Sequence, residues 1–199
     1  AHAGAMPLLP GASKTVAFTP ALFDQLDSEL VDAMGRDRII TPDDVRGDYP
    51  TLNQAVLAGA WPRLADARGK VVFLMLTANG PGGASDYLVG HPGLKGRAAF
   101  LRAMPGEAHA AFLLLDNALV RGSEIRDYVK QGYFVRSRSD IETFEAKIND
   151  TKRAKAAFAS GAQIVSTDFE QAGNAYGTSY VVRLPDGGDM RCNPVNAAR

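Results

Sequence analysis

Two arginines on one predicted strand are the residues of this chain best suited to hold an anion. In the stretch "GYFVRSRSD" at residues 132–140, Arg136 and Arg138 are two positions apart, so a strand places both guanidinium groups on the same face. Two neighbouring cations repel each other unless an anion or carboxylates lie between them. A phosphate matches paired arginines because guanidinium groups bind its oxygens with directed hydrogen bonds. The spacing therefore predicts a phosphate-binding pair.

The same residues also permit a purely structural interpretation. In that alternative, Arg136 and Arg138 pair with Asp116, Asp140 or Asp168 in a layer of salt bridges. The sequence alone leaves both interpretations open. If the arginines bind phosphate, removing Arg136 should weaken phosphate binding much more than it lowers the melting temperature.

Four short apolar runs predict the strands that carry these groups. Each run is about six residues long, which is typical of strands covered on both faces in a parallel sheet. Helical patterns at 94–104, 123–131 and 141–160 fill the intervals, and Gly132 and Gly161 are placed to end helices. The runs lie at 71–76, 110–115, 133–138 and 163–168.

Repeated strand-then-helix units predict an α/β fold with a parallel sheet, either a (β/α) barrel of the TIM type or a small open, doubly wound sheet. A full eight-unit barrel needs about 250 residues. The 199 residues contain about four to five βα units, counting a weaker apolar piece at 38–41. This length fits half a barrel in one domain over residues 1–199.

Polar side chains follow the predicted strands at the point where each strand ends. Sites in parallel α/β folds form at the carboxyl ends of strands, so we expect these groups to meet at one rim. The candidate phosphate-binding and substrate-binding residues are Asn79, Asp116, Arg136, Arg138, Asp140, Thr167 and Asp168.

The first part of the chain is predicted to be an irregular segment followed by two helices. Residues 1–19 are rich in Ala, Gly and Pro and show no periodicity, which predicts an irregular segment. A helix should begin at Thr19-Pro20 and end at Gly35, and a second should run from about 51 to 67, where Pro62 ends or bends it. The run at 180–185 predicts an extra strand or a lid.

The composition argues against two classes of partner. Lys plus Arg and Asp plus Glu number 22 each, so no net charge attracts nucleic acid. The chain is 46% hydrophobic without a run of 18 apolar residues, which argues against a transmembrane segment. The first residues show no basic start and apolar core of a signal peptide, and we expect a segment upstream.

The histidines do not form an obvious proton-transfer pair, so the catalytic residues stay unknown at this stage. His2 lies in the lead-in, and His109 precedes a strand, on the rim opposite the predicted site. His91 follows a strand end, but its neighbours Gly90 and Pro92 favour a turn residue over a general acid or base.

Other short motifs have simpler interpretations. The "GPGG" at 80–83 lacks the residues of a phosphate-binding P-loop and predicts a flexible turn. Asp43-Asp44 and Asn149-Asp150 are expected at helix starts rather than around calcium, and no Cys or His cluster has zinc spacing. Cys192, the single cysteine, is either a structural thiol or the partner of a cysteine outside this chain.

Several segments together resemble a known family. They are "TPDDVRGDYPTLNQAVLAGAWPRLADARGKVVFLML", "GYFVRSRSD", "NDTKRAKAAFASGAQIVSTDF" and "RLPDGGDMRCNPV". From about residue 20 to the end, the chain resembles the C-terminal half of the bacterial and fungal calcium-dependent phosphoinositide phospholipase C family, which belongs to the TIM-barrel phosphodiesterases. Arg136, Arg138, Asp140 and Asp168 match its arginine-rich strand and its strand end "STD".

The resemblance implies an exported, secreted or periplasmic phosphodiesterase in which a metal-assisted pair of histidines cleaves a phosphodiester. In that family, the histidines and the metal-binding carboxylates lie on early strands, and nothing in this chain matches them. The Ca²⁺ ligands of the complete enzyme are therefore expected outside this chain. Thr77-Ala-Asn79 also stands where relatives often carry an Asp-Asn pair.

Three functions remain open from the sequence. The first is a phosphoric diester hydrolase acting on a phosphodiester or phosphoinositide, in which this chain holds the phosphate and is inactive alone until a missing N-terminal half completes it. The second is a non-catalytic half-barrel that pairs with a second copy or another partner. The third is an enzyme acting on sugar or nucleotide phosphates on a doubly wound sheet.

Overall fold

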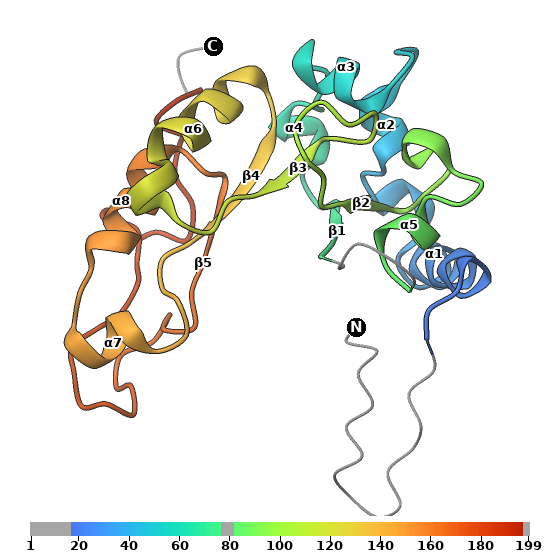
Figure 1. Ribbon diagram of the computed structural model, residues 1–199. Coiled ribbons are helices and arrows are strands. Elements are labelled where there is room, and N and C mark those ends of the chain that lie inside the picture. Colours follow the sequence, from blue (N-terminus) through green and yellow to red (C-terminus); the bar gives the residue numbers. More distant parts are fainter. Residues whose placement is uncertain (1–16, 77–81, 197–199) are drawn as a thin grey trace, which may run out of the picture. The chain divides into compact units, whose positions relative to one another are not determined.

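The computed structural model describes residues 17–76 and 82–196 (Figure 1). Its contacts divide the chain into two compact units, Ala1–Ala111 and Phe112–Arg199, and each contains helices around a small parallel sheet. The single partial domain expected over residues 1–199 stays a prediction. Most of the lead-in at 1–19 lies outside the described residues.

The first unit begins with the expected helix. The Thr19 hydroxyl accepts a hydrogen bond from the Leu22 amide, Pro20 occupies the first turn, and Gly35 ends the helix with a φ of +83°. These are standard start and stop signals. The elements are α1 (Pro20–Met34), η1 (Arg36–Arg38), α2 (Pro42–Arg46), α3 (Leu52–Leu57), α4 (Leu64–Ala67), β1 (Phe73–Met75), α5 (Ala84–Tyr87), η2 (Pro92–Leu94) and β2 (Ala99–Leu101).

The helix predicted at 94–104 is wrong, because residues 99–101 form β2, parallel to β1 with Phe73 opposite Ala99. All three residues of β2 are buried, and a short apolar run buried on both faces has the same pattern as a buried helix segment. The helix predicted at 51–67 is two helices, α3 and α4, with Pro62 in the gap. The weak strand near Ile39 forms a single parallel bridge to Val71.

The second unit contains β3 (Phe112–Leu114), α6 (Ala118–Gln131), β4 (Phe134–Arg138), α7 (Phe144–Ile148), α8 (Lys152–Ser160) and β5 (Ile164–Ser166). The three strands are parallel in the order β3-β4-β5. Helices α6 and α8 pack against each other and against β4 (Figure 1). Tyr133, Val135 and Ser137 are buried, while the alternate residues Arg136 and Arg138 remain partly exposed, as the alternation along a strand predicts.

Two expectations for this unit are corrected. The helix predicted at 141–160 is interrupted, because Asn149 adopts a left-handed conformation with a φ of +55° and separates α7 from α8. Residues 180–185 form no strand; Tyr180 and Val182 instead pack with Ala146 and Ala154 in a small core. Gly132 and Gly161 end α6 and α8 in left-handed conformations, as predicted.

The described residues form small parallel sheets in a mixed α/β arrangement, with no closed barrel among them. This arrangement is consistent with a partial barrel, and it confirms the predicted parallel strands at all four apolar runs. The strand β2 is the one that the sequence pattern did not predict.

Candidate functional site

The first arginine of the predicted pair lies between two neighbouring strands. In the parallel register, Arg136 of β4 stands beside Leu114 of β3, and Asp116 follows two residues later on the same face. The Arg136 Nη1 donates a hydrogen bond of 2.9 Å to the Asp116 Oδ1. Arg136 is thus paired with a carboxylate, as the salt-bridge interpretation expected.

The second arginine is held more loosely. The Arg138 Nη2 lies 3.7 Å from the Asp168 Oδ2, which is an ion pair but too long for a hydrogen bond. Within the described residues, the Arg138 guanidinium makes no hydrogen bond. The Arg136 side chain is 19% exposed and that of Arg138 is 28% exposed, so a small anion in solvent can reach both.

The structure places Asp140 inside the protein rather than beside the exposed arginines. Its side chain is fully buried, and its Oδ2 accepts hydrogen bonds from the Ser139 hydroxyl at 2.7 Å and the Thr167 hydroxyl at 2.6 Å. Its Oδ1 accepts one from the Asp168 amide at 3.3 Å. Asp140 therefore fixes the end of β5, which turns Thr167 inward while the Asp168 side chain stays exposed near Arg138.

A further arginine at this end of the sheet was missed by the sequence reasoning. The Arg153 Nε donates to the Glu145 Oε1 at 2.6 Å, and its Nη1 donates to the Asn117 Oδ1 at 2.8 Å. The Ile141 amide donates to the Glu145 Oε2. Burial opposes ionisation of Glu145, but these hydrogen bonds outweigh it and hold its pKa below the usual value of 4.5. Arg153 therefore connects the end of β3 to α7.

Nothing in the sequence distinguished Arg153 from an ordinary surface residue of a helix. It follows Lys152 in a basic stretch, where a solvated side chain is the common outcome. Thr77 and Asn79, expected at the end of β1, lie outside the described residues, as do His2 and the first half of the "GPGG" turn.

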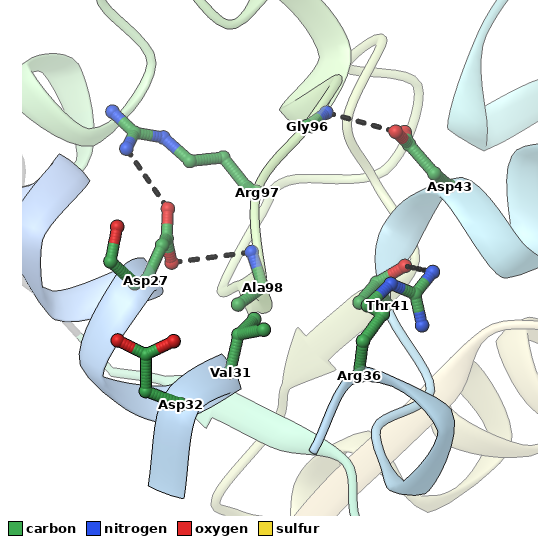
Figure 2. Close-up of a pocket in the computed structure, with 10 residues that line it drawn as sticks. Asp27, Val31, Asp32, Arg36, Thr41, Asp43, Gly96, Arg97 and Ala98 are labelled. Atoms are coloured by element: carbon green, nitrogen blue, oxygen red, sulfur yellow. Dashed lines mark hydrogen bonds and ion pairs between the residues drawn. The ribbon is translucent and has the colours of Figure 1, made fainter. Parts of the chain in front are cut away.

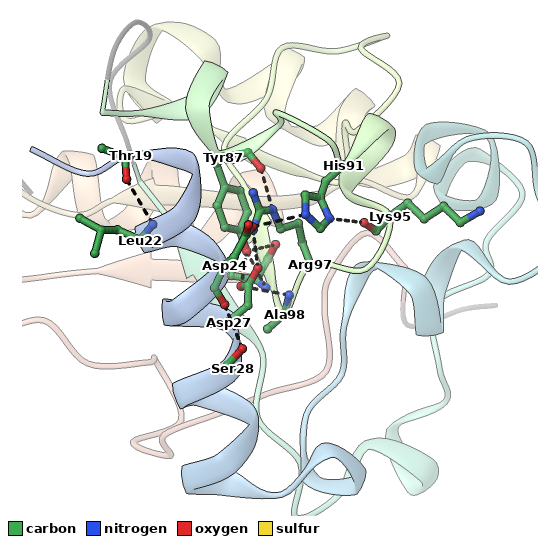
Figure 3. A network of polar contacts seen from close by, with 11 residues as sticks. Thr19, Leu22, Asp24, Asp27, Ser28, Tyr87, His91, Lys95, Arg97 and Ala98 are labelled. Carbon is green, nitrogen blue, oxygen red and sulfur yellow. Dashed lines mark hydrogen bonds and ion pairs between the residues drawn. The ribbon is translucent and has the colours of Figure 1, made fainter.

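A second polar cluster lies in the first unit, around the buried Arg97 (Figure 3). The Arg97 Nη1 donates to Asp24 at 2.6 Å and to Asp27 at 2.9 Å, and its Nε donates to the Tyr87 carbonyl at 2.7 Å. The guanidinium carbon also lies 4.4 Å from the centre of the Tyr87 ring. Burial, reinforced by Asp27, raises the pKa of Tyr87 far above its usual value.

This cluster has the character of a structural junction. The Tyr87 hydroxyl and the Ala98 amide both donate to the Asp27 Oδ1, so one carboxylate of α1 holds the segment between β1 and β2. His91 belongs to the same junction, since its Nδ1 lies 2.7 Å from the Lys95 carbonyl oxygen and its Nε2 lies 3.4 Å from Asp24. These contacts agree with a histidine that stabilises a turn.

A pocket of about 320 Å³ opens beside this junction (Figure 2). Its lining carries both signs of charge, but most of these groups already have partners. Arg36 donates to the Thr41 hydroxyl and to Asp44, the Asp43 Oδ2 accepts from the Gly96 amide, and Arg97 is paired as described. The Asp32 carboxylate is the charged group of this lining that has no partner within the described residues.

The described residues do not provide a calcium site. No group of three or more His, Cys, Asp or Glu side chains in the described ranges is arranged to hold a metal ion. Asp44 caps α2 together with Thr41, and Asp150 accepts a hydrogen bond from the Lys152 amide at the start of α8, so both predicted helix starts are confirmed. His109 stands near Glu107, and burial lowers its pKa below 6.5.

Comparison with known proteins gives one match. Residues 2–194 match the sequence model of the protein family described as "Phosphoinositide phospholipase C, Ca2+-dependent". No curated protein and no solved structure matches the chain. Within the described residues, no helix is both long enough and apolar enough to cross a membrane.

Proposed function

The chain belongs to the Ca²⁺-dependent phosphoinositide phospholipase C family, and from this premise we propose that it forms the phosphate-holding side of a phosphoric diester hydrolase. In this proposal Arg136 and Arg138 bind the phosphate of a phosphoinositide. The observation that carries it is the pair of partly exposed guanidinium groups on one face at the end of β4.

The two arginines differ in how readily they accept an anion. Arg138 forms a loose ion pair with Asp168 but donates no hydrogen bond to a described residue, so an anion can bind its donors without breaking a hydrogen bond. Arg136 must share or give up its hydrogen bond to Asp116. Guanidinium donors bind phosphate oxygens strongly, and we therefore assign the first phosphate contact to Arg138 and the second to Arg136.

Proton transfer and metal chemistry require groups that this site does not contain. The arginines supply charge stabilisation only, whereas a phosphodiesterase of this kind also needs an acid, a base and a metal. The described residues form no cluster of His, Cys, Asp or Glu that could hold a metal ion, so the proposal assigns no Ca²⁺ ligand to them. We also propose that the protein is exported. We expect the isolated chain to show no phosphodiesterase activity.

One observation favours the alternative of a non-catalytic half-barrel. The Ser139 amide donates to the Ser166 carbonyl, so the backbone of Ser166 faces β4 and that of Val165, one residue earlier, faces away from it. β5 is the last strand of its sheet, and an unpaired edge can add a strand from another chain. Concentration-dependent self-association without phosphate binding would favour this alternative.

The test of the proposed function is phosphate binding by single arginine variants. Inorganic phosphate and inositol 1-phosphate are titrated into the 199-residue chain by calorimetry, and Arg138→Ala and Arg136→Ala are each expected to weaken binding about tenfold or more. Arg121→Ala is the control, because it removes another exposed, ion-paired arginine of the same unit. If all three variants bind alike, or if the first two only lower the melting temperature, the proposal is wrong.

A further inference from the structure

Arg153 of α8 is a largely buried cation that contacts the segments following β3 and β4. Its side chain is 12% exposed, and that of its ion-pair partner Glu145 is 5% exposed. The attraction in a buried ion pair often does no more than offset the cost of removing both charges from water, so such a pair is weak evidence for a purely stabilising role. The second partner of Arg153 is Asn117, which directly follows Asp116 of the arginine site.

Asn117 occupies the N-cap position of α6 but does not cap the helix. An asparagine at this position usually accepts a hydrogen bond from the amide of the second or third helical residue. Here the Asn117 side chain makes no such bond to the described residues of α6, and its Oδ1 accepts from the Arg153 Nη1 at 2.8 Å instead. The chain thus gives up a usual helix cap beside Asp116, the partner of Arg136, and departures of this kind are typical of functional sites.

The other contact of Arg153 leads to the second arginine of the pair. The Arg153 Nε donates to the Glu145 Oε1, and the Glu145 Oε2 accepts from the Ile141 amide at 2.9 Å. Ile141 directly follows the buried Asp140, whose Oδ1 accepts from the amide of Asp168. Asp168 is in turn the ion-pair partner of the second arginine. One guanidinium group therefore holds the segments on which both carboxylates of the site depend.

We propose that Arg153 is a positioning residue that sets the spacing between the guanidinium groups of Arg136 and Arg138. It acts through the two carboxylates that contact them, Asp116 and Asp168. The inference rests on the proposed function, because two arginines bind one phosphate together only when surrounding contacts hold their donors in a convergent arrangement. An arginine suits this role, since its planar group donates to two partners at fixed angles, whereas a lysine is a single point charge.

The variant Asn117→Ser separates positioning from stability. Serine is as good an N-cap as asparagine and can cap α6, but its shorter side chain withdraws the acceptor from Arg153. We expect a melting temperature that is unchanged or higher, together with an affinity for inorganic phosphate that is about five- to tenfold weaker. The affinity is measured by calorimetry on the full 199-residue chain.

Arg153→Lys is the second variant, because a lysine can keep the ion pair with Glu145 but cannot also donate to Asn117 in the same geometry. It should retain most of the stability and bind phosphate about as weakly as Asn117→Ser. Arg126→Lys is the matched control. Arg126 also joins two helices of this unit, but its hydrogen bond goes to the Ala159 carbonyl near the end of α8, so phosphate affinity should not change.

Nuclear magnetic resonance of the arginine side chains tests the positioning without any ligand. The Nε–H signals of Arg136 and Arg138, assigned with their alanine variants, should shift in Asn117→Ser and Arg153→Lys but not in Arg126→Lys. The positioning proposal is overturned if these signals keep their wild-type positions. It is also overturned if phosphate binding depends on Arg136 and Arg138 but is unchanged in Asn117→Ser. Shifted signals with wild-type phosphate affinity in Arg138→Ala contradict only the proposed function.

Discussion

Asp116→Asn separates the two interpretations of the arginine pair better than loss of an arginine does. If Asp116 is a competitor that an incoming phosphate must displace from Arg136, then removing its charge should tighten phosphate binding. If the pair is only structural, the substitution should cost a little stability and leave phosphate binding as it was. The predictions differ in sign as well as in size.

The magnitude follows from Coulomb's law. A phosphate that shares the Arg136 guanidinium with Asp116 would lie roughly 5 Å from that carboxylate, which in bulk water corresponds to about 0.8 kcal/mol of repulsion per charge. The site is partly buried, so about 1 kcal/mol is a reasonable expectation and corresponds to an affinity about fivefold tighter. Because Asp116 is 39% exposed, the loss of stability should stay below about 1 kcal/mol.

The assay is a calorimetric phosphate titration at low salt, repeated at high salt, where screening should shrink the difference. Glu124→Gln is a matched control, because Glu124 is also 39% exposed and pairs with Arg121 in the same unit. Competition by Asp116 is refuted if Asp116→Asn binds phosphate no better than wild type, or if Glu124→Gln gives the same gain. Weaker binding in Asp116→Asn would mean that Asp116 orients Arg136 for the anion.

Two further predictions concern stability. Arg97→Met should lower the free energy of unfolding by about 3–5 kcal/mol in urea titrations, because it leaves the buried Asp27 carboxylate without its cation; a loss below 1 kcal/mol would contradict this. Glu145 has a folded pKa below 4.5, so its contribution to stability is complete above pH 4.5 and disappears as the pH falls through the folded pKa. Urea titrations from about pH 6 to pH 3 should therefore show a steeper loss of stability for wild type than for Glu145→Gln, and parallel curves would refute the assignment.

The strands were predictable because burial on both faces leaves continuous apolar runs, and all four runs contain strands in the structure. The strand β2 was missed because "AAFL" at 98–101 is flanked by arginines and methionine at spacings that also fit a helix. The helix predicted over 141–160 ran through Asn149, although Asn149-Asp150 was also expected at a helix start; asparagine tolerates the left-handed conformation found there better than most residues.

The sequence predicted only those residues of the arginine site that lie in or directly after a strand. Strand alternation and the rule of carboxyl ends predicted two contacts that the structure contains, Arg136 with Asp116 and Arg138 with Asp168. Each aspartate follows, by two residues, a strand residue that is in register with the arginine's strand. Arg153 was not predictable, because its partners Glu145 and Asn117 depend on how α7 and α8 fold back over the sheet. Such contacts depend on tertiary packing and produce no periodic pattern in the amino-acid sequence.

The contrast between Asp140 and Asp168 explains how one strand end can be both rigid and open to an anion. Asp140 receives three hydrogen bonds and is fully buried, and one of its donors is the amide of Asp168 itself. The backbone at the end of β5 is therefore fixed, whereas the Asp168 side chain is 67% exposed and only loosely paired with Arg138. In the proposed function, this fixed backbone and loosely paired carboxylate would let a phosphate take the place of Asp168 beside Arg138 without moving the strand.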